Sequence, residues 1–503
     1  MTALSRADVL VIGAGIAGLT AAALLARHGK KVCLLEAHQQ SGGCAGTFCR
    51  GPYIFDAGAT QVAGFELGGS HQRLCSELGV ALPTATPLDP GCVVDLNDGH
   101  PPVRIWRDQQ RWKQERRQQF PGSERFWQIS DAIHASNWSF AGRRPILPPR
   151  SGWDLRQLLQ ALGPGNLASG LLTTATVADL LRLCGCSGER HRRLRRFLDL
   201  QLRLYSQEPA DRTAALYGVT VLSMVQEPLG LWHLHGSMQE LSHTLETALA
   251  LAGGSLLLRH RVEKLQRRDD QWLVVGSAAG GQRFEFKAGD VVCSLAPQVL
   301  PELLGKQMPQ GLAQRLQQLG DPSGALVLYG AVKREHLPAD CPSHLQLDWA
   351  QPGSLFVSVS QDGDGRAPRG EATVIASVFT PARPWFELDR NEYKQAKAKA
   401  QHGIEAGLEQ LLALQPQHWL RRELATPMGF RRWTGRPYGF VGGIGQAPDR
   451  FGPFGLASRS PLPGLWLCGD AIYPGEGTAG VSLSAEMAVR QLLQAQRKSG
   501  LRA

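Results

Sequence analysis

The chain has 503 residues, of which 43% are hydrophobic and 19% are charged. This composition is that of an ordinary folded enzyme, and it excludes a disordered or low-complexity chain. The length allows one large domain or two to three ordinary domains. The 54 basic and 44 acidic residues give a net charge of +10, and much of the basic excess is clustered in Arg104–Arg117 and Arg190–Arg196.

The N-terminal segment has the pattern of a βαβ unit that binds a dinucleotide. Val9–Ile12 is predicted to form a buried strand, Gly13–Gly18 matches G-x-G-x-x-G, and a helix then extends to about His28. A second strand, Lys31–Leu35, ends at Glu36. The distance along the chain from Gly18 to Glu36 is close to the spacing of about 20 residues that is expected for a carboxylate that binds a ribose hydroxyl.

The residues of this turn have separate physical roles. Gly13 permits the tight turn, Gly15 lets the backbone approach a pyrophosphate, and Gly18 lets helix and strand pack closely. Ile16 and Ala17 open the helix, whose free N–H groups and positive dipole end would bind the pyrophosphate.

The uncharged run Val9–Ala26 has the minimum length of a membrane span and also resembles a signal peptide. The glycine pattern argues against both, so we expect no transmembrane helix, no signal peptide and a cytoplasmic location. The ten cysteines include no C-x-x-C pair, and no pair of histidines completes a zinc site. We therefore expect reduced thiols and no metal.

A second glycine turn distinguishes the dinucleotide. Glu36 and Ala37 are followed closely by Gly42, Gly43 and Cys44, a turn that lets the chain pass close to the far half of the cofactor. NAD sites rarely carry this extension, whereas FAD sites of the amine-oxidase type do. The stretch Phe55–Thr60 resembles the next segment of that family, and it predicts Gly58, Ala59 and Thr60 as cofactor contacts.

The segment 71–230 is predicted to be mainly helical. Within it, Trp153–Leu183 is rich in leucine, and its pattern allows either the lining of a lipophilic cavity or an ordinary core. In Arg104–Phe120, basic residues alternate with tryptophans, which suits an anionic membrane surface or a solvated basic face. No recognition motif supports nucleic-acid binding.

The segment 231–300 returns to strand and helix patterns. We predict a helix over Met238–Ala250 and strands over Ser255–Leu258 and Asp290–Ser294, and we expect Val262 to lay its backbone against the adenine. The segment 301–433 alternates strand-like runs with one long helix, Arg390–Leu414.

The C-terminal segment carries the last cofactor motif. Gly464–Cys468 is predicted to form a buried strand that ends in Gly469 and Asp470, whose carboxylate would accept hydrogen bonds from a ribityl chain. A glycine loop then starts a helix at about Thr478, and its N-terminus would face a flavin and stabilise negative charge there.

These segments predict an α/β protein with a Rossmann-type FAD-binding domain and a discontinuous α+β substrate domain. The FAD-binding domain is predicted to comprise residues 1–70, 231–300 and 434–503. The substrate domain is predicted to comprise residues 71–230 and 301–433.

The motifs together resemble the carotenoid desaturase and isomerase branch of the amine-oxidase-like flavoproteins. The C-terminal run Gly469–Val481 is the most specific part, and Asp56–Gly64 and Phe197–Gln207 narrow the resemblance to cyanobacterial C-3′,4′ desaturases of myxoxanthophyll synthesis. The cofactor contacts that we predict are Gly13, Gly15, Ile16, Ala17, Gly18, Glu36, Ala37, Gly42, Gly43, Cys44, Gly58, Ala59, Thr60, Val262, Gly469, Asp470, Ala479, Gly480 and Val481.

The resemblance implies FAD as cofactor and desaturation of an acyclic carotenoid end at C-3,4. It also implies a peripheral position at a membrane and a quinone or oxygen as electron acceptor. Glu476, His233 and His235 are the candidate acid–base residues by type and position. Two alternatives stay open: a cis–trans carotenoid isomerase, and a non-catalytic binding protein like the Rab escort and dissociation-inhibitor proteins.

Overall fold

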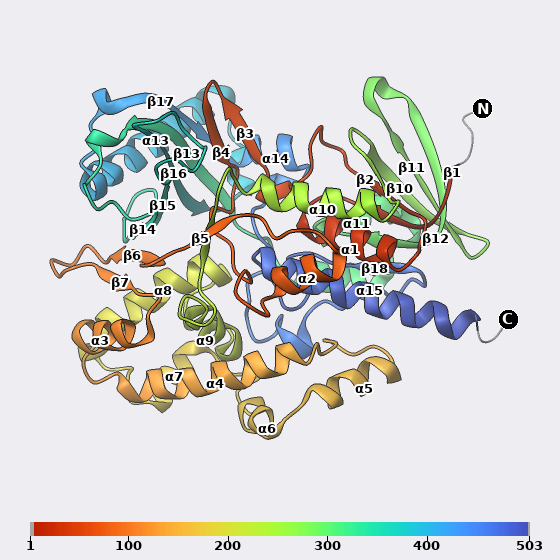
Figure 1. The fold of residues 1–503 in the computed structure, drawn as a ribbon, viewed down its shortest axis with the longest axis horizontal. Helices are drawn as coiled ribbons and strands as arrows, with labels where there is room; N and C mark the ends of the chain where they lie inside the picture. Colours follow the sequence, from red (N-terminus) through yellow and green to blue (C-terminus); the bar gives the residue numbers. More distant parts are fainter. Residues whose placement is uncertain (1–4, 501–503) are drawn as a thin grey trace.

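The computed structural model describes residues 5–500 and contains two large sheets (Figure 1). The first sheet has the order β10-β11-β12-β1-β2-β9, with β18 pairing with β12. Its strands are β1 (Ser5–Ile12), β2 (Val32–Leu35), β9 (Ser255–Leu257), β10 (Arg261–Arg268), β11 (Gln271–Ser277), β12 (Arg283–Cys293) and β18 (Leu465–Leu467). The pairings around β1 and β2 are parallel, and β10 and β11 add an antiparallel extension.

Both faces of the first sheet are covered, which is why its central strands are continuously apolar. Val9 and Val11 pack into a core formed with helices α1, α10 and α15, whereas Leu10 and Ile12 face a second core on the other side. The helices of the first core are α1 (Ile16–Arg27), α2 (Ser70–Leu78), α10 (Gln239–Leu251) and α15 (Thr478–Gly500).

The second sheet lies apart from the first (Figure 1) and has the order β17-β13-β16-β15-β14-β6-β7. Its strands are β6 (Cys92–Asp95), β7 (Val103–Ile105), β13 (Gly324–Lys333), β14 (His344–Leu347), β15 (Leu355–Val359), β16 (Glu371–Thr380) and β17 (Trp419–Ala425). Helix α13 (Arg390–Leu412) covers one face. The hairpin of β3 (Thr47–Arg50) and β4 (Tyr53–Asp56) and helix α14 (Pro427–Thr434) pack on the other. Two further strands, β5 (Ala85–Pro87) and β8 (Trp232–Leu234), form a small sheet.

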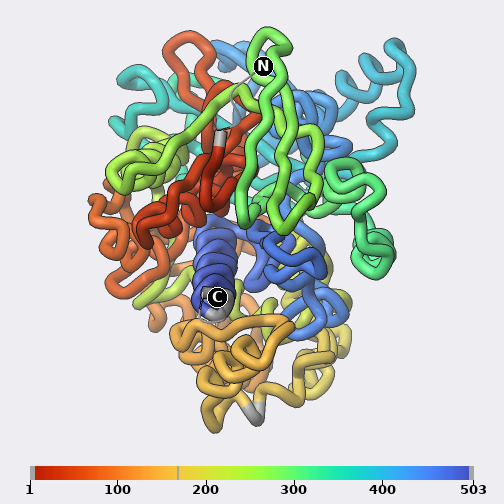
Figure 2. The backbone as a smooth tube through the Cα atoms, turned by 90° about the vertical axis from the view of Figure 1, so that its right-hand side faces the viewer, coloured from red at the N-terminus to blue at the C-terminus, as the bar shows by residue number. Residues whose placement is uncertain are grey.

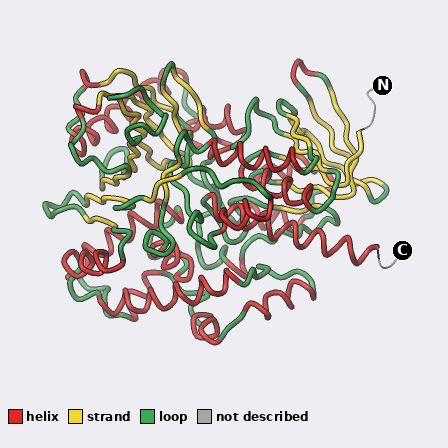
Figure 3. Tube along the Cα trace, viewed as in Figure 1, coloured by secondary structure: helices red, strands yellow, loops and turns green. Residues whose placement is uncertain are grey.

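A layer of helices completes the molecule and gathers along one edge, as Figure 3 shows. Its helices are α3 (Gln109–Gln119), α4 (Glu124–Gly142), α5 (Gly152–Ala161), α6 (Pro164–Gly170), α7 (Val177–Leu183), α8 (Arg192–Ser206) and α9 (Ala215–Ser223). In Figure 2, α15 runs between this layer and the first sheet. Arg490 of α15 donates to Gln157 of α5 and to the Arg144 carbonyl, which links the two layers.

The sheets draw on sequence-distant segments, and the packing differs from the predicted boundaries in two places. Helices α11 (Leu300–Leu304) and α12 (Gln310–Gln318) pack on the first sheet, although they follow residue 300. Strands β6 and β7 extend the second sheet, although they lie in the segment predicted to be mainly helical. Apolar patterning marks which residues are buried, but it does not say against which sheet they pack.

Candidate active site

One large cavity, of about 2090 Å³, extends from the N-terminus of α1 to the second sheet and the helical layer. A pocket for a single drug-sized ligand typically has roughly 300–1,000 Å³. The cavity therefore has room for a dinucleotide and for a second molecule beside it.

The first glycine turn forms one end of this cavity. Gly13 has a φ of +92°, and a Cβ atom at Gly18 would lie 1.8 Å from the Gly13 carbonyl oxygen, so only glycine fits there. At Gly15 a Cβ atom would meet no other atom within 4 Å, and Gly15 lines the cavity. Helix α1 starts at the next residue with no side-chain cap, so the N–H groups of its first turn lack intrahelical partners at the cavity. This backbone suits a pyrophosphate.

Glu36 is held by two backbone groups. Its Oε2 accepts a hydrogen bond of 2.7 Å from the Ala14 N–H, and its Oε1 accepts one of 2.7 Å from the His38 N–H. The carboxylate lines the cavity and keeps further lone pairs that could accept a ribose hydroxyl.

The second glycine turn packs directly on the first. Gly42 has a φ of +106° and donates a 2.8 Å hydrogen bond to the Ala14 carbonyl. A Cβ atom at Gly43 would lie 3.3 Å from the Gly15 Cα. The two turns thus form one continuous wall of the cavity.

The C-terminal motif supplies another wall. Asp470 forms an ion pair with Arg436, and both side chains are mostly buried at the cavity. Ala479, Gly480 and Val481 lie in the first turn of α15. Arg436 belongs to no recognisable sequence motif, so it was not predicted as a site residue.

Most of the predicted cofactor residues meet at this cavity. Those that line it are Gly13, Gly15, Ile16, Ala17, Glu36, Gly42, Gly43, Cys44, Gly58, Ala59, Thr60, Gly469, Asp470, Ala479, Gly480 and Val481. Gly18, Ala37 and Val262 do not line it. Gly18 packs behind the turn, and Val262 lies half-buried in β10 against the core of the first sheet.

The three acid–base candidates occupy different environments. His235 is exposed to solvent and does not line the cavity. His233 is 3% exposed and belongs to a buried ionic network behind the cavity wall. Glu476 does line the cavity, so it is the candidate that the structure brings to the site.

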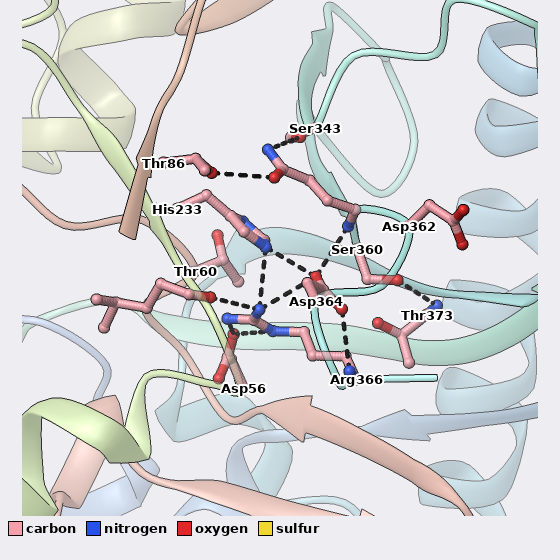
Figure 4. Close-up of polar contacts among 12 residues, drawn as sticks. Asp56, Thr60, Thr86, His233, Ser343, Ser360, Asp362, Asp364, Arg366 and Thr373 are labelled. Carbon is pink, nitrogen blue, oxygen red and sulfur yellow. Dashed lines mark hydrogen bonds and ion pairs between the residues drawn. The ribbon is translucent and has the colours of Figure 1, made fainter. Parts of the chain in front are cut away.

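The buried network joins three segments, as Figure 4 shows. Arg366 donates two hydrogen bonds to Asp56 Oδ2, at 3.1 and 3.0 Å, and its Nη1 lies 3.2 Å from Asp364 Oδ2. His233 Nε2 lies 2.8 Å from the same Asp364 oxygen, and Asp56 Oδ1 accepts the Met238 N–H. Burial raises the pKa of Asp56, and the Arg366 charge opposes this effect. The network fixes the end of β4, from which Gly58–Thr60 continue into the cavity wall.

Glu476 is held from two sides. Its Oε1 accepts a hydrogen bond of 2.6 Å from Gln207 Nε2 and one of 3.0 Å from the Gly443 N–H. Burial raises the pKa of Glu476 to about 8, and the negative charge of Asp470 acts in the same direction.

The helical layer contributes apolar and polar residues to the cavity wall, among them Trp138, Leu158, Leu162 and Thr173. Tyr329 of the second sheet lines the cavity beside the cofactor turns, because its hydroxyl donates to the Ala57 carbonyl. The leucine-rich segment Trp153–Leu183 therefore has two roles. Leu158 and Leu162 line the cavity, whereas Leu180 and Leu181 are buried in the core of the helical layer.

The basic–aromatic stretch is buried in part, and its tryptophans face inward. Trp112 is 4% exposed and packs against Trp127 and Phe197, and Arg116 is buried beside Asp131. Trp106 is partly buried against the same core, and Arg107 is mostly buried and ion-paired with Glu227. The exposed basic residues of the stretch are Arg104, Arg111, Lys113 and Arg117. Among residues 5–500, no helix combines the length and the apolar character needed to cross a bilayer.

The two glycine turns and the cavity suit a protein that binds a dinucleotide beside a second molecule. The family model described as flavin containing amine oxidoreductase matches residues 16–493. The chain therefore belongs to this family, and FAD is its cofactor.

Two relatives of known function are named for prolycopene and for retinol as their substrates. The chain is 26% identical to prolycopene isomerase 2 of an Oncidium hybrid cultivar, over 96% of this chain and 83% of the relative. It is 24% identical to the human all-trans-retinol 13,14-reductase, over 93% and 82% respectively.

Solved structures share the fold at lower identity. Putrescine oxidase bound to putrescine aligns with a TM-score of 0.64 at 18% identity, over 98% of this chain and 99% of that chain. Cyclohexylamine oxidase of Brevibacterium oxydans aligns with a TM-score of 0.61 at 17% identity, over 97% and 99%.

Proposed function

We propose that this protein is an FAD-dependent desaturase that inserts a double bond at C-3,4 of an acyclic carotenoid end. The observation that supports this proposal is the continuity of the cavity, which joins the glycine turns to an apolar compartment. A long polyene that lay in the apolar part could bring one end to the cofactor segments. The resemblance of Asp56–Gly64 and Phe197–Gln207 favours the desaturase within the family.

We further propose that the cavity-lining cofactor residues hold FAD. In this proposal the first turn of α1 binds the pyrophosphate, Glu36 binds the ribose, and Asp470 binds the ribityl chain. The bound flavin supplies a hydride acceptor. The apolar wall, including Leu158, orients the polyene and excludes water from the reacting end.

The electron acceptor and the location follow from the substrate. Because a carotenoid resides in lipid, we propose that the enzyme lies peripherally on the cytoplasmic side of a membrane and passes electrons to a quinone or to oxygen. The exposed leucines beside the cavity support this position: Leu155 is 47%, Leu159 is 58% and Leu171 is 85% exposed.

A carotenoid isomerase is the second candidate, and the match to prolycopene isomerase over 96% of this chain favours it. Mixing oxidised holoenzyme with lycopene or a 1-hydroxylated carotenoid under anaerobic conditions separates the two functions. Desaturation should bleach the flavin absorbance and yield a red-shifted product lighter by two hydrogen atoms. A product of equal mass that differs only in cis–trans geometry would identify an isomerase and would overturn the desaturase proposal.

A further inference from the structure

The side-chain hydrogen-bond partner of Glu476, Gln207, is itself held in a fixed position. Gln207, at the C-terminus of α8, has a left-handed backbone with φ of 60°, which is costly for a residue other than glycine. Its Nε2 donates to Glu476 Oε1 and to the Val441 carbonyl, and its Oε1 accepts the Ser323 N–H. The side chain of Gln207 is thus fixed from three directions.

The hydrogen bonds leave one carboxyl oxygen of Glu476 available. Both bonds, from Gln207 and from Gly443, end on Oε1. Oε2 accepts no hydrogen bond from the part of the chain that the structure describes. Glu476 lines the same cavity as Gly469 and Ala479, and it lies two residues before the start of α15.

We propose that Glu476 accepts the proton that leaves the substrate in the desaturation and that Gln207 is its positioning residue. The inference rests on the proposed function. In the step, a hydride leaves one carbon for FAD with the electron pair of its C–H bond. The neighbouring carbon loses a proton to the Glu476 carboxylate, and the electron pair of that second C–H bond becomes the new π bond.

The charges around Glu476 suit a group that titrates close to the working pH. Burial and Asp470 raise the pKa of its carboxyl to about 8, whereas the Gly443 N–H, Arg436 and Gln207 lower it. The other titratable groups that face this region are Cys44 and Tyr217, whose own pKa values are raised by burial. A general base is most effective when its pKa lies near the operating pH.

The pH dependence has a definite sign. The base must be deprotonated, so turnover should rise as pH increases through the pKa of about 8. Replacing Gln207 by leucine removes a hydrogen bond that favours the charged carboxylate. Gln207→Leu should therefore move the midpoint of the pH profile to a higher pH, an effect that a merely structural role would not produce.

The decisive variant is Glu476→Gln, which keeps the shape and an acceptor for Gln207 but cannot titrate. Holoenzyme of this variant should bind FAD normally and lose turnover by about 100-fold or more, and Glu476→Asp should recover part of the loss. Glu486→Gln is the matched control, because Glu486 lies on α15, the helix that begins two residues after Glu476. Glu486 is 7% exposed and has a pKa raised by burial, yet it does not line the cavity. The control variant should turn over like the wild type.

A second measurement does not depend on turnover. Infrared spectra of the apoprotein should show a protonated carboxyl band that disappears near pH 8 in the wild type and in Glu486→Gln but is missing in Glu476→Gln. Two results would overturn the inference. One is wild-type turnover by Glu476→Gln, and the other is a Glu476 carboxyl band that already disappears below about pH 6. If the wild type converts no carotenoid, the proposed function fails, and the infrared titration alone then decides whether Glu476 has the required protonation behaviour.

Discussion

At the scale of single residues, two glycines of the first turn differ in whether the packing of the protein requires them. Gly18 is required by the protein itself, because any Cβ atom would collide with the Gly13 carbonyl. Gly15 has open space around its Cα and a φ of −69°, which any residue can adopt. The fold itself therefore does not require glycine at position 15, and we expect the requirement to come from the ligand.

We expect Gly15→Val to fold normally and to lose FAD binding, because its side chain would occupy the space of the pyrophosphate. Gly188→Val is a matched control, since Gly188 also precedes a helical turn with φ −71° and ψ 170°, has no neighbour within 4 Å and lies outside the cavity. Flavin absorbance after gel filtration measures the result. Normal FAD content in Gly15→Val would show that the cofactor lies elsewhere.

The buried network makes Arg366 important for stability. Arg366→Met would leave Asp56 and Asp364 buried without their cation, and breaking such a pair costs about 3–5 kcal/mol. Urea unfolding of the apoprotein measures this loss. Arg192→Met is the control, because Arg192 and Glu189 are 70% and 78% exposed, and such a surface pair contributes about 0–1 kcal/mol. Equal effects of the two variants would contradict the structural role of the network.

At the scale of elements, α5, α6 and the residue that follows each of these helices present exposed leucines beside the cavity. Leu155, Leu159, Leu162 and Leu171, which we term the leucine face, are all more than one-third exposed. The flanking charges are the exposed Arg156 and Arg150, whereas Asp154 is completely buried. An apolar face with a basic rim suits an anionic lipid surface.

We expect Leu159→Gln and Leu171→Gln each to weaken vesicle binding by roughly tenfold or more, because a buried leucine contributes about 1.5–3 kcal/mol. Flotation with vesicles that contain anionic lipid measures binding. Leu251→Gln should bind like the wild type, because Leu251 is 73% exposed but belongs to α10, which lies apart from α5 and α6 in Figure 1. Undiminished flotation of the double variant Leu159→Gln/Leu171→Gln would exclude the leucine face as the membrane contact.

At the scale of the whole molecule, the cofactor cavity connects segments that are distant in the chain. Its walls come from the first turn near Gly15, from Gly43, from Gly58 and from the start of α15 at Thr478. A ligand that contacts all of them binds the folded chain and not the unfolded one, so it stabilises the fold by mass action.

We expect FAD at one hundred times its Kd to stabilise the apoprotein by about 2.7 kcal/mol. Thermal unfolding with FAD, FMN and NAD at equal concentration measures this effect. FAD should raise the Tm most, because FMN lacks the adenylate half that Glu36 and the first turn are proposed to hold. Equal shifts with FMN and FAD would show that the first turn does not hold the adenylate.

Local patterns in the sequence determined the elements and the cofactor turns. The strand before Gly13, the helix after it and the spacing to Glu36 are short-range features, so they can be recognised without knowledge of the fold. Three strands of the second sheet, β13, β15 and β16, and the long helix α13 were recognised for the same reason, close to their observed bounds, whereas β6, β7, β14 and β17 were not predicted. The family and its cofactor FAD followed from these motifs.

Only the tertiary structure decided which side chains meet. Gln207, Arg436 and Glu476 come from separate elements, and no spacing in the chain indicates that they share one cavity wall. Arg366 reaches Asp56 across more than half of the chain, and this contact placed His233 in a structural network. Trp112 was predicted as part of a possible membrane contact and lies in the core. Burial and long-range contact depend on how distant segments pack, and this information is absent from any local pattern.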